Sequence, residues 1–504
     1  MNARQVSTVL SRAPAGLAAP LVRVEVHVGP GLPAFFMVGL PEAVVRESRE
    51  RVRSALLTAG FSFPSGRITV NLAPADLPKE GGRFDLPIAM GILAASDQLP
   101  RDALRQREFY GELSLSGELR ETPKLLPALV AGSRVGTELI LPAANALEAS
   151  LVAGPRIKLA RHLIEVCNAL SGGAPLPNAS PLESLASAFR PQPDLADVRG
   201  QFAAKRALEI AAAGGHGLLM IGPPGAGKTL LAQRLPGLLP PLRKSEALQV
   251  ASLESAAGRR PGLGRCRPFR SPQHTASVAA LIGGGALRPG ELSLAHLGVL
   301  FLDELPEFAR NALEALREPL ESGVVMLSRA KRSYEFPARF QLVAAMNPCP
   351  CGYAGDPRGR CRCTGEQVAR YRNRLSGPLI DRIDMHVELA ALPVEHLLGE
   401  TPPAAETSGS VAARVAAARG LQSTRQGKLN ARLTPSEVVR VCPLDRQSRV
   451  LMRTAIARLG LSARAFHRVL KLARTCADLR DSANICAIDV SEAVTLRALD
   501  RPTW

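Results

Sequence analysis

The stretch HGLLMIGPPGAGKTLLAQRL, residues 216–235, decides the fold class of the chain. An apolar run typical of a buried strand leads into a glycine-rich turn, and a helix with apolar periodicity follows. The turn consists of Gly222, Pro223, Pro224, Gly225, Ala226, Gly227, Lys228 and Thr229. Its glycines let backbone N–H groups face inward around phosphates, while Lys228 can reach the β- and γ-phosphates and Thr229 can ligate Mg²⁺. We therefore expect an ATP-binding P-loop in an α/β fold, and not a structural turn with a chance lysine.

The stretch LGVLFLDELPEF, residues 297–308, indicates a second buried strand that ends in two carboxylates. We expect Asp303 to complete the Mg²⁺ shell and Glu304 to polarise the water that attacks the γ-phosphate. Acidic residues also commonly start helices, so this interpretation depends on the P-loop upstream. A third strand, FQLVAAMN, ends on Asn347, whose amide could either orient water near the γ-phosphate or satisfy a turn.

Length and hydropathy indicate the class of protein. A chain of 504 residues is too long for one compact core, so we expect about two to four domains. No window supplies the roughly 18 uncharged apolar residues that a membrane span needs, and the first residues contain no export signal. We therefore expect a cytoplasmic protein without a membrane partner.

The net positive charge of the chain indicates what kind of molecule it could bind. The chain carries 63 Lys and Arg residues against 45 Asp and Glu residues, a net charge of +18. Clustered cations bind polyanions such as DNA, whereas charges spread over solvated faces would indicate no partner. Four Tyr and one Trp are too few for base stacking to be the main binding mode.

Changes of pattern divide the chain into domains. Residues 1–171 alternate strand-like and helical runs, and a linker rich in Pro, Ser and Ala covers residues 172–197. Residues 198–395 alternate strands and helices as a parallel α/β sheet does. After a second polar gap, residues 411–504 have the periodicity of an all-helical domain.

Four of the nine Cys fall within residues 349–363, which we expect to form an insertion in the core. They are Cys349, Cys351, Cys361 and Cys363. Four thiolates at this range suit tetrahedral Zn²⁺, although the two cysteines of a zinc-binding pair are usually separated by two or more residues. The alternative is a group of four reduced surface thiols.

Five motifs occur in an order and at a spacing that resemble one known family. They are GPPGAGKT, VLFLDE, AAMNPCPCG, SGPLIDRID and LSARAFHRVLKLARTCADL. In these motifs the chain is similar to the ComM/YifB family of magnesium-chelatase-like AAA+ ATPases. The resemblance implies an AAA+ P-loop α/β core with a C-terminal helical lid, with ATP and Mg²⁺ bound. It also implies a homo-hexamer with helicase activity, which drives branch migration of single-stranded and branched DNA in natural transformation, independently of sequence.

The same resemblance implies three residue roles. Asn347 corresponds to sensor 1, Arg382 to the arginine finger that acts on a neighbouring subunit's ATP, and Arg464 to the sensor-2 arginine of the lid. A guanidinium supplied in trans would neutralise charge that develops on the transferred phosphoryl group. The alternative for Arg382 is a salt bridge with Asp381 or Asp384, and two further arginines share the helical segment of Arg464.

The N-terminal domain resembles the proteolytic domain of Lon and the C-terminal domain of RadA in residues 67–95, 110–120 and 138–145. Lon-type proteolysis needs a Ser–Lys dyad in which the amine takes the proton of the serine. Arg83 stands where we align the nucleophilic serine, and Lys124 is out of register with the general-base lysine. We expect an inactive Lon-like α+β domain, with proteolysis by Ser114 or Ser116 as the weaker alternative.

Two segments of the core are candidates for substrate contact. Residues 265–290 look like the helix-2 insert of this AAA+ clade, and residues 324–340 indicate a hairpin with the basic residues Arg329, Lys331 and Arg332. Basic pore hairpins could grip a phosphate backbone without reading sequence, whereas a solvated charged hairpin would bind nothing.

Two other functions stay open for the whole chain. One is a magnesium-chelatase ATPase subunit that serves porphyrin metallation, against which the Lon-like domain and the cysteine block argue. The other is an ATP-dependent protease or unfoldase, which the missing dyad disfavours.

Overall fold

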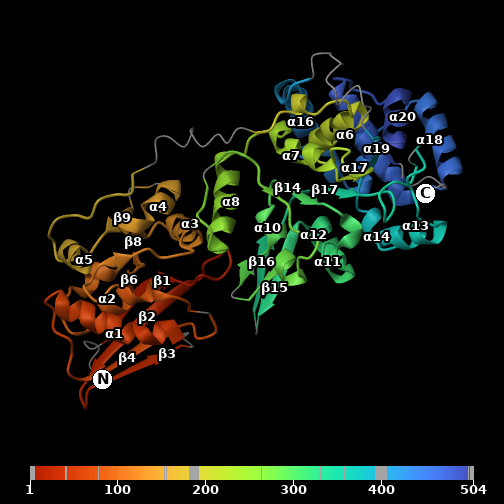
Figure 1. The fold of residues 1–504 in the computed structure, drawn as a ribbon. Helices are drawn as coiled ribbons and strands as arrows, with labels where there is room; N and C mark the ends of the chain where they lie inside the picture. The colour runs from red at the N-terminus through yellow and green to blue at the C-terminus, as the bar shows by residue number, and fades with distance from the viewer. Residues whose placement is uncertain are drawn as a thin grey trace.

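The computed structural model builds the chain around two large β-sheets and a C-terminal group of helices (Figure 1). The α/β class with a parallel-sheet core, predicted from the sequence, is confirmed. The structure describes residues 6–39, 43–77, 79–152, 154, 156–180, 192–262, 264–285, 287–329, 332–355, 358–391, 406–497 and 499.

The first sheet is mixed and lies in the N-terminal part of the chain, red to gold in Figure 1. In spatial order its strands are β3 (Ala34–Val38), β4 (Arg67–Ala73), β2 (Leu21–Gly29), β1 (Val6–Arg12), β5 (Arg107–Phe109), β8 (Glu138–Pro142) and β9 (Ile157–Ala160). The β4–β2 and β2–β1 pairs are antiparallel, and the other neighbours are parallel. In β4, Ile68, Val70 and Leu72 are buried and the residues between them are more exposed, the period of two expected of a strand.

Helices cover this sheet. They are α1 (Ala43–Thr58), α2 (Asp85–Ala95), α3 (Leu126–Val135), α4 (Ala146–Val152) and α5 (Leu163–Leu170). Apart from Asp85 at its start, the helix α2 is apolar, and it is fully buried because it packs on β1 and β2 and against α1.

The second sheet is wholly parallel and carries the P-loop. In spatial order its strands are β11 (Phe269–Arg270), β14 (Val299–Leu302), β17 (Gln341–Met346), β10 (Leu218–Ile221) and β18 (Met385–Glu388). Every residue of β10, β14 and β17 is buried, as expected of parallel strands covered on both faces. Parallel strands end at one shared edge, so the residues that follow these three strands lie together there.

Short helices and two hairpins surround the parallel sheet. The helices are α6 (Phe202–Gly214), α7 (Lys228–Leu238), α8 (Lys244–Ala256), α9 (Val278–Ile282), α10 (Glu291–Leu294), α11 (Arg310–Glu314), α12 (Arg317–Ser322), α13 (Gly365–Arg372) and α14 (Gly377–Ile380). The hairpins are β12 (Gly283–Gly284) with β13 (Arg288–Pro289), and β15 (Val324–Arg329) with β16 (Arg332–Pro337).

The C-terminal helices, blue in Figure 1, form the lid. They are α16 (Ser408–Gln426), α17 (Pro435–Val441), α18 (Arg446–Leu459), α19 (Ala463–Leu479) and α20 (Ala487–Thr495). Most of their buried apolar side chains belong to one hydrophobic cluster with side chains of α6, α7 and the parallel sheet, so lid and core share a hydrophobic core. None of the described helices combines the length and the hydropathy needed to cross a bilayer.

The helix α8 joins the N-terminal part to the core and stands beside α3 in Figure 1. Ala251 of α8 packs with Leu126 and Leu151 in a small apolar cluster. Ser255 Oγ, at the end of α8, donates a hydrogen bond of 2.7 Å to Glu148 Oε1. These contacts attach the first sheet to the helix that follows the P-loop helix.

Two segments differ from the sequence-based prediction. Residues 265–290 contain β11, which is an edge strand of the main sheet, so only their later part lies outside it. The strand β11 was not predicted because two residues are too few to show the alternation of apolar and polar residues that indicates a strand. Within the predicted linker, Ala179 N donates to Ile157 O at 2.8 Å and Leu176 is buried, so this part of the segment packs beside β9.

Candidate functional site

The P-loop connects β10 to α7 at the carboxyl edge of the parallel sheet. Gly225 and Gly227 have φ angles of 79° and 87°, in the left-handed region that side chains with a Cβ rarely adopt. At Gly222 a Cβ would lie 2.7 Å from Leu389 O, so a larger residue would push the loop away from the sheet. The loop therefore curls over the start of α7, whose free N–H groups can bind an anion.

Lys228, the first residue of α7, is held by three neutral oxygen acceptors. Its Nζ donates to Gly222 O at 2.6 Å, to Pro223 O at 3.0 Å and to Asn347 Oδ1 at 3.0 Å. Burial lowers the pKa of Lys228, and the nearby carboxylates act in the opposite direction. Because its direct partners are uncharged, the ammonium group remains available to neutralise phosphate oxygens.

Thr229 and Asp303 meet across the sheet edge. Thr229 Oγ1 donates to Asp303 Oδ2 at 2.8 Å, and Asp303 Oδ1 accepts a hydrogen bond from the backbone N–H of Glu304 at 2.9 Å. A hydroxyl and a carboxylate are oxygen ligands of the kind that Mg²⁺ binds beside substrate phosphates. The pair therefore fits Mg²⁺, as predicted for these two residues.

A cavity of about 340 Å³ gathers the predicted nucleotide site. It is lined by Pro224, Gly225, Ala226, Gly227, Lys228, Thr229, Leu230, Asp303, Glu304, Met346 and Asn347. The structure thus brings together Lys228, Asp303 and Asn347, which the sequence separates by more than a hundred residues in total. The strand order explains this, since β17 lies between β10 and β14 and places Asn347 between the P-loop and the carboxylates.

A second cavity, of about 430 Å³, shares Asp303 and Glu304 with the first. The segment from Ser271 to Thr275 forms its other wall, and His274 Nδ1 lies 3.4 Å from Glu304 Oε2. The sequence analysis missed His274. The one signal for His274 was its position after β11, the strand that pairs with β14. Because β11 has only two residues, it is too short to be recognised as a strand from the sequence.

Arg382 is predicted as the finger that reaches a neighbouring subunit. Its Nη2 pairs with Glu321 Oε1 at 2.5 Å and its Nη1 donates to Pro378 O at 2.6 Å, while Nε is buried without a partner. Arg382 therefore does form a salt bridge, but the alternative prediction named the wrong partner: it is Glu321 and not Asp381 or Asp384. Arg382 is not among the described residues that line the two cavities. This position is expected of an arginine that acts on the ATP of another subunit.

The arginines of α19 have different environments. Arg468 Nη1 pairs with Asp384 Oδ1 at 2.6 Å, and Arg474 is buried with Asp478 at 3.0 Å. Arg464 lies exposed in the first turn of α19 and does not line either described cavity. Its sensor-2 role stays a prediction, but the other two arginines are engaged elsewhere.

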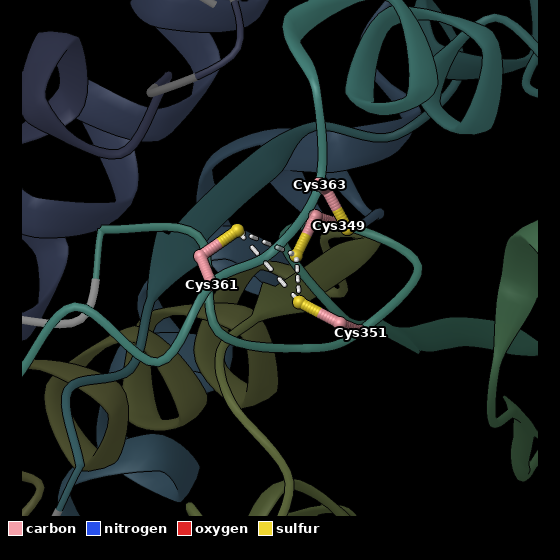
Figure 2. A group of neighbouring side chains, drawn as sticks. All are labelled: Cys349, Cys351, Cys361 and Cys363. Carbon is pink, nitrogen blue, oxygen red and sulfur yellow. Dashed lines mark hydrogen bonds between the residues drawn. The ribbon is translucent and has the colours of Figure 1, made fainter.

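The four predicted zinc ligands converge in the loop after β17, as Figure 2 shows. All four Sγ atoms lie within 4.8 Å of one another, and the distances from Cys351 to Cys349 and Cys361 are 3.3 and 3.7 Å. Tetrahedral zinc with Zn–S bonds of about 2.3 Å needs S–S separations of about 3.8 Å. The fourth ligand, Cys363, lies in the same group, so the donor set fits Zn²⁺.

The thiols of this group ionise unequally. Backbone N–H groups of Arg362 and Tyr353 lower the pKa of Cys351 to about 6, whereas hydrogen bonds to the neighbouring thiols, together with desolvation, raise the pKa of Cys361 and raise that of Cys363 to about 11. The loop also touches the nucleotide site, because a Cβ at Gly352 would lie 2.8 Å from Pro224 Cδ. The cysteine loop therefore forms a wall behind the P-loop.

The predicted protease site contains no assembled dyad at its aligned positions. Arg83 is buried and its Nη2 donates to Pro123 O at 2.5 Å, and burial lowers its pKa to about 10. Lys124 Nζ pairs with Glu80 Oε2 at 3.1 Å, and Ser114 Oγ bonds to Ser116 Oγ at 2.8 Å. These partners give no support to a serine activated by Lys124, and the Lon-like relationship stays a prediction.

The basic hairpin is described only in part. Arg329 and Arg332 pair as backbone at the ends of β15 and β16. Lys331 lies outside the described residues, so the grip on a phosphate backbone stays a prediction.

Comparisons with known proteins cover nearly the whole chain. The family model described as magnesium chelatase, subunit ChlI, matches residues 194–397. The models for subunit ChlI of Mg-chelatase and for the ChlI C-terminal region match residues 24–145 and 405–497.

Similar curated proteins are aligned over nearly their full length. The chain is 50% identical over 503 residues to the competence protein ComM of Haemophilus influenzae, with 98% of each chain covered. It is 49% identical over 500 residues to the uncharacterized protein YifB of Escherichia coli, again with 98% of each chain covered. An uncharacterized protein of Mycobacterium tuberculosis is 41% identical over 492 residues and 96% of each chain. With this identity and the P-loop site in place, the chain belongs to the ComM/YifB family of magnesium-chelatase-like AAA+ ATPases.

Proposed function

We propose that the chain hydrolyses ATP and uses the energy to move the strands of branched DNA, working as a homo-hexamer. The observation that carries the ATPase part is the convergence of Lys228, Thr229, Asp303, Glu304 and Asn347 on one cavity. Together they supply phosphate binding, metal binding and activation of water, which phosphoryl transfer needs.

In this proposal Lys228 and the loop N–H groups bind the β- and γ-phosphates, and Thr229 and Asp303 hold Mg²⁺. The bound metal would supply positive charge to the phosphate oxygens. Glu304 accepts a proton from the attacking water as its oxygen bonds to the γ-phosphorus and the bond to ADP breaks. Asn347, already bonded to Lys228, orients that water.

The proposed assembly follows from Arg382. The guanidinium of Arg382 is held outside the nucleotide cavity of its own chain. The negative charge that develops on the γ-phosphate in the transition state would therefore be neutralised by Arg382 of another copy. Hydrolysis would then depend on contact between subunits, and a closed ring provides that contact for every site.

The DNA part of the proposal has two supports. The net charge of +18 suits a polyanion, and the relative from Haemophilus influenzae is named a competence protein. A motor that integrates incoming strands would need contacts to phosphates that ignore sequence.

We also propose that the cysteine group holds one Zn²⁺. The proposal is supported by the four Sγ atoms, which all lie within 4.8 Å of one another, close to the spacing of a tetrahedral site. The metal would fix the loop that contains Gly352 against Pro224 and so support the P-loop.

The test is a labelled three- or four-strand DNA junction incubated with protein, ATP and Mg²⁺ at low salt. We expect strand displacement with ATP and none with the Lys228→Ala variant, which removes the phosphate-binding charge. ATP turnover without any displacement would refute the DNA motor. The magnesium-chelatase-type ATPase would then become the better assignment.

A further inference from the structure

Four arginines gather where the lid covers the amino edge of the parallel sheet. Arg267 precedes β11 and Arg339 precedes β17 by two residues each, Arg419 lies in α16, and Arg432 ends the short helix η7 (Asn430–Arg432). Arg339 and Arg432 are exposed, and the other two are half-buried. The nucleotide cavity lies at the carboxyl edge, so this arginine group occupies the opposite edge of the sheet.

The group lacks the acidic partners that neighbouring arginines have. Arg414, Arg425 and Arg468 of the lid all pair with carboxylates at 2.5 to 2.7 Å. Across the described ranges, no salt bridge joins any of the four arginines to a carboxylate. Four neighbouring cations without a directly paired carboxylate repel one another in the isolated chain.

Backbone carbonyls hold two of these side chains in place. Arg267 donates from Nε to Pro240 O and from Nη1 to Leu297 O, both at 2.7 Å, and Arg419 Nε donates to Ala212 O at 2.9 Å. These bonds orient the guanidinium groups but leave their charge unneutralised, and the remaining guanidinium N–H groups have no hydrogen bond to the part of the chain that the structure describes. A guanidinium fixed in this way needs little further ordering to bind an anion.

The charges act on one another. Burial and the neighbouring Arg267 and Arg432 lower the pKa of Arg419 to about 9. Although the Arg432 residue as a whole is exposed, partial desolvation of its guanidinium lowers its pKa, and Arg339 lowers it further. The pKa of His296, buried beside Arg339 and Arg432, falls to about 4, mainly through burial. The nearby carboxylate is Glu246, whose Oε2 accepts a hydrogen bond from Arg243 N at the start of α8. The region is therefore strongly positive.

We propose that Arg267, Arg339, Arg419 and Arg432 bind successive phosphates of a nucleic-acid strand. The four come from four separate segments of core and lid, so they suit a chain of phosphates better than one small anion. Guanidinium groups bind phosphate oxygens bidentately, and this contact is independent of base sequence. The choice of nucleic acid as the ligand rests on the proposed DNA motor.

The two exposed members provide the test. Arg339→Gln/Arg432→Gln removes two charges from the group, and Arg453→Gln/Arg458→Gln removes two from exposed arginines of α18 as a matched control. Binding of a fluorescent single strand is followed by anisotropy between low and high KCl, without ATP. Each phosphate contact to a single strand contributes about 0.7 to the slope of log affinity against log salt. Two lost contacts lower the slope by about 1.4 and weaken binding by about 25-fold at 0.1 M salt.

The Arg339→Lys/Arg432→Lys variant keeps the charge, so we expect it to retain most of the parental slope. That result, with the glutamine variant melting at the parental temperature, shows that lost charge and not misfolding is responsible. A glutamine variant with the slope of the α18 control would overturn the inference.

Two further measurements distinguish nucleic-acid binding from polyphosphate binding and from a contact between subunits. Inorganic polyphosphate is tested as a competitor, and light scattering gives the oligomeric mass. If the glutamine variant loses polyphosphate binding but keeps DNA binding, or loses oligomeric mass at unchanged DNA affinity, the nucleic-acid assignment is wrong. If DNA affinity depends on the arginines but no junction ever moves, this inference stands and the proposed motor fails.

Discussion

Replacing Glu304 with Gln tests the proposed base without changing the shape of the site. The side chain of Glu304 is 53% exposed. The hydrogen bond from the backbone N–H of Glu304 to Asp303 Oδ1 does not involve the carboxylate of Glu304, so the substitution leaves it in place. The Thr229–Asp303 pair and the contacts of Lys228 stay in place. We therefore expect ATP to bind with the same or slightly higher affinity, because one negative charge near the phosphates is lost.

The expected loss is in turnover. A positioned general base contributes about 10²- to 10⁴-fold. This corresponds to about 2.7 to 5.4 kcal/mol of activation free energy. Because Glu304 is half exposed and water can partly replace it, we expect a loss of about 10²- to 10³-fold.

The assay combines steady-state ATP hydrolysis with a titration of fluorescent ATP. The control is Glu307→Gln, which removes a carboxylate three residues further on that pairs with Arg374 at 2.7 Å. It should change turnover by less than about twofold, since an exposed ion pair contributes little. A kcat for Glu304→Gln within tenfold of the parent, at saturating ATP, would refute the assignment of the base.

Other outcomes follow from the same geometry. Lys228→Ala should abolish turnover and weaken ATP binding in the same titration, and parental affinity would contradict the phosphate contact. Arg382→Ala should bind ATP but not hydrolyse it, and mixing it with Lys228→Ala should restore part of the activity. No recovery at any ratio in co-assembled protein would exclude the trans role. His274→Ala should lower kcat more than it raises KM, since it contacts Glu304 and not the P-loop; a change in KM alone would contradict this. Purified protein should contain about one zinc per chain by elemental analysis, and Cys351→Ser should lose it.

Local sequence was enough to predict the nucleotide site. Gly222 to Thr229 and the two carboxylates follow buried strands, and parallel strands place such residues at one edge. Asn347 followed from the same rule, and the convergence of the four cysteines was predicted from their spacing.

Contacts between distant segments were harder to predict. Glu321 as the partner of Arg382 comes from a separate helix, and nothing in the motif around Arg382 indicates it. His274 follows a strand of two residues, too short for any period to appear. The arginine group draws on four segments whose proximity depends on the packing of the lid.

The shared hydrophobic core of lid and P-loop domain limits where this molecule can bend. Val411 and Val415 of α16 are buried in the same cluster as Leu231 of α7, and Arg206 of α6 pairs with Glu492 of α20 at 2.8 Å. Opening the lid would expose such side chains at about 1.5–3 kcal/mol each. We therefore expect core and lid to move together as one body. In an assembly of several copies, the mechanical hinge would be the contact between neighbouring subunits, and the stroke would be a rotation of one whole subunit against the next.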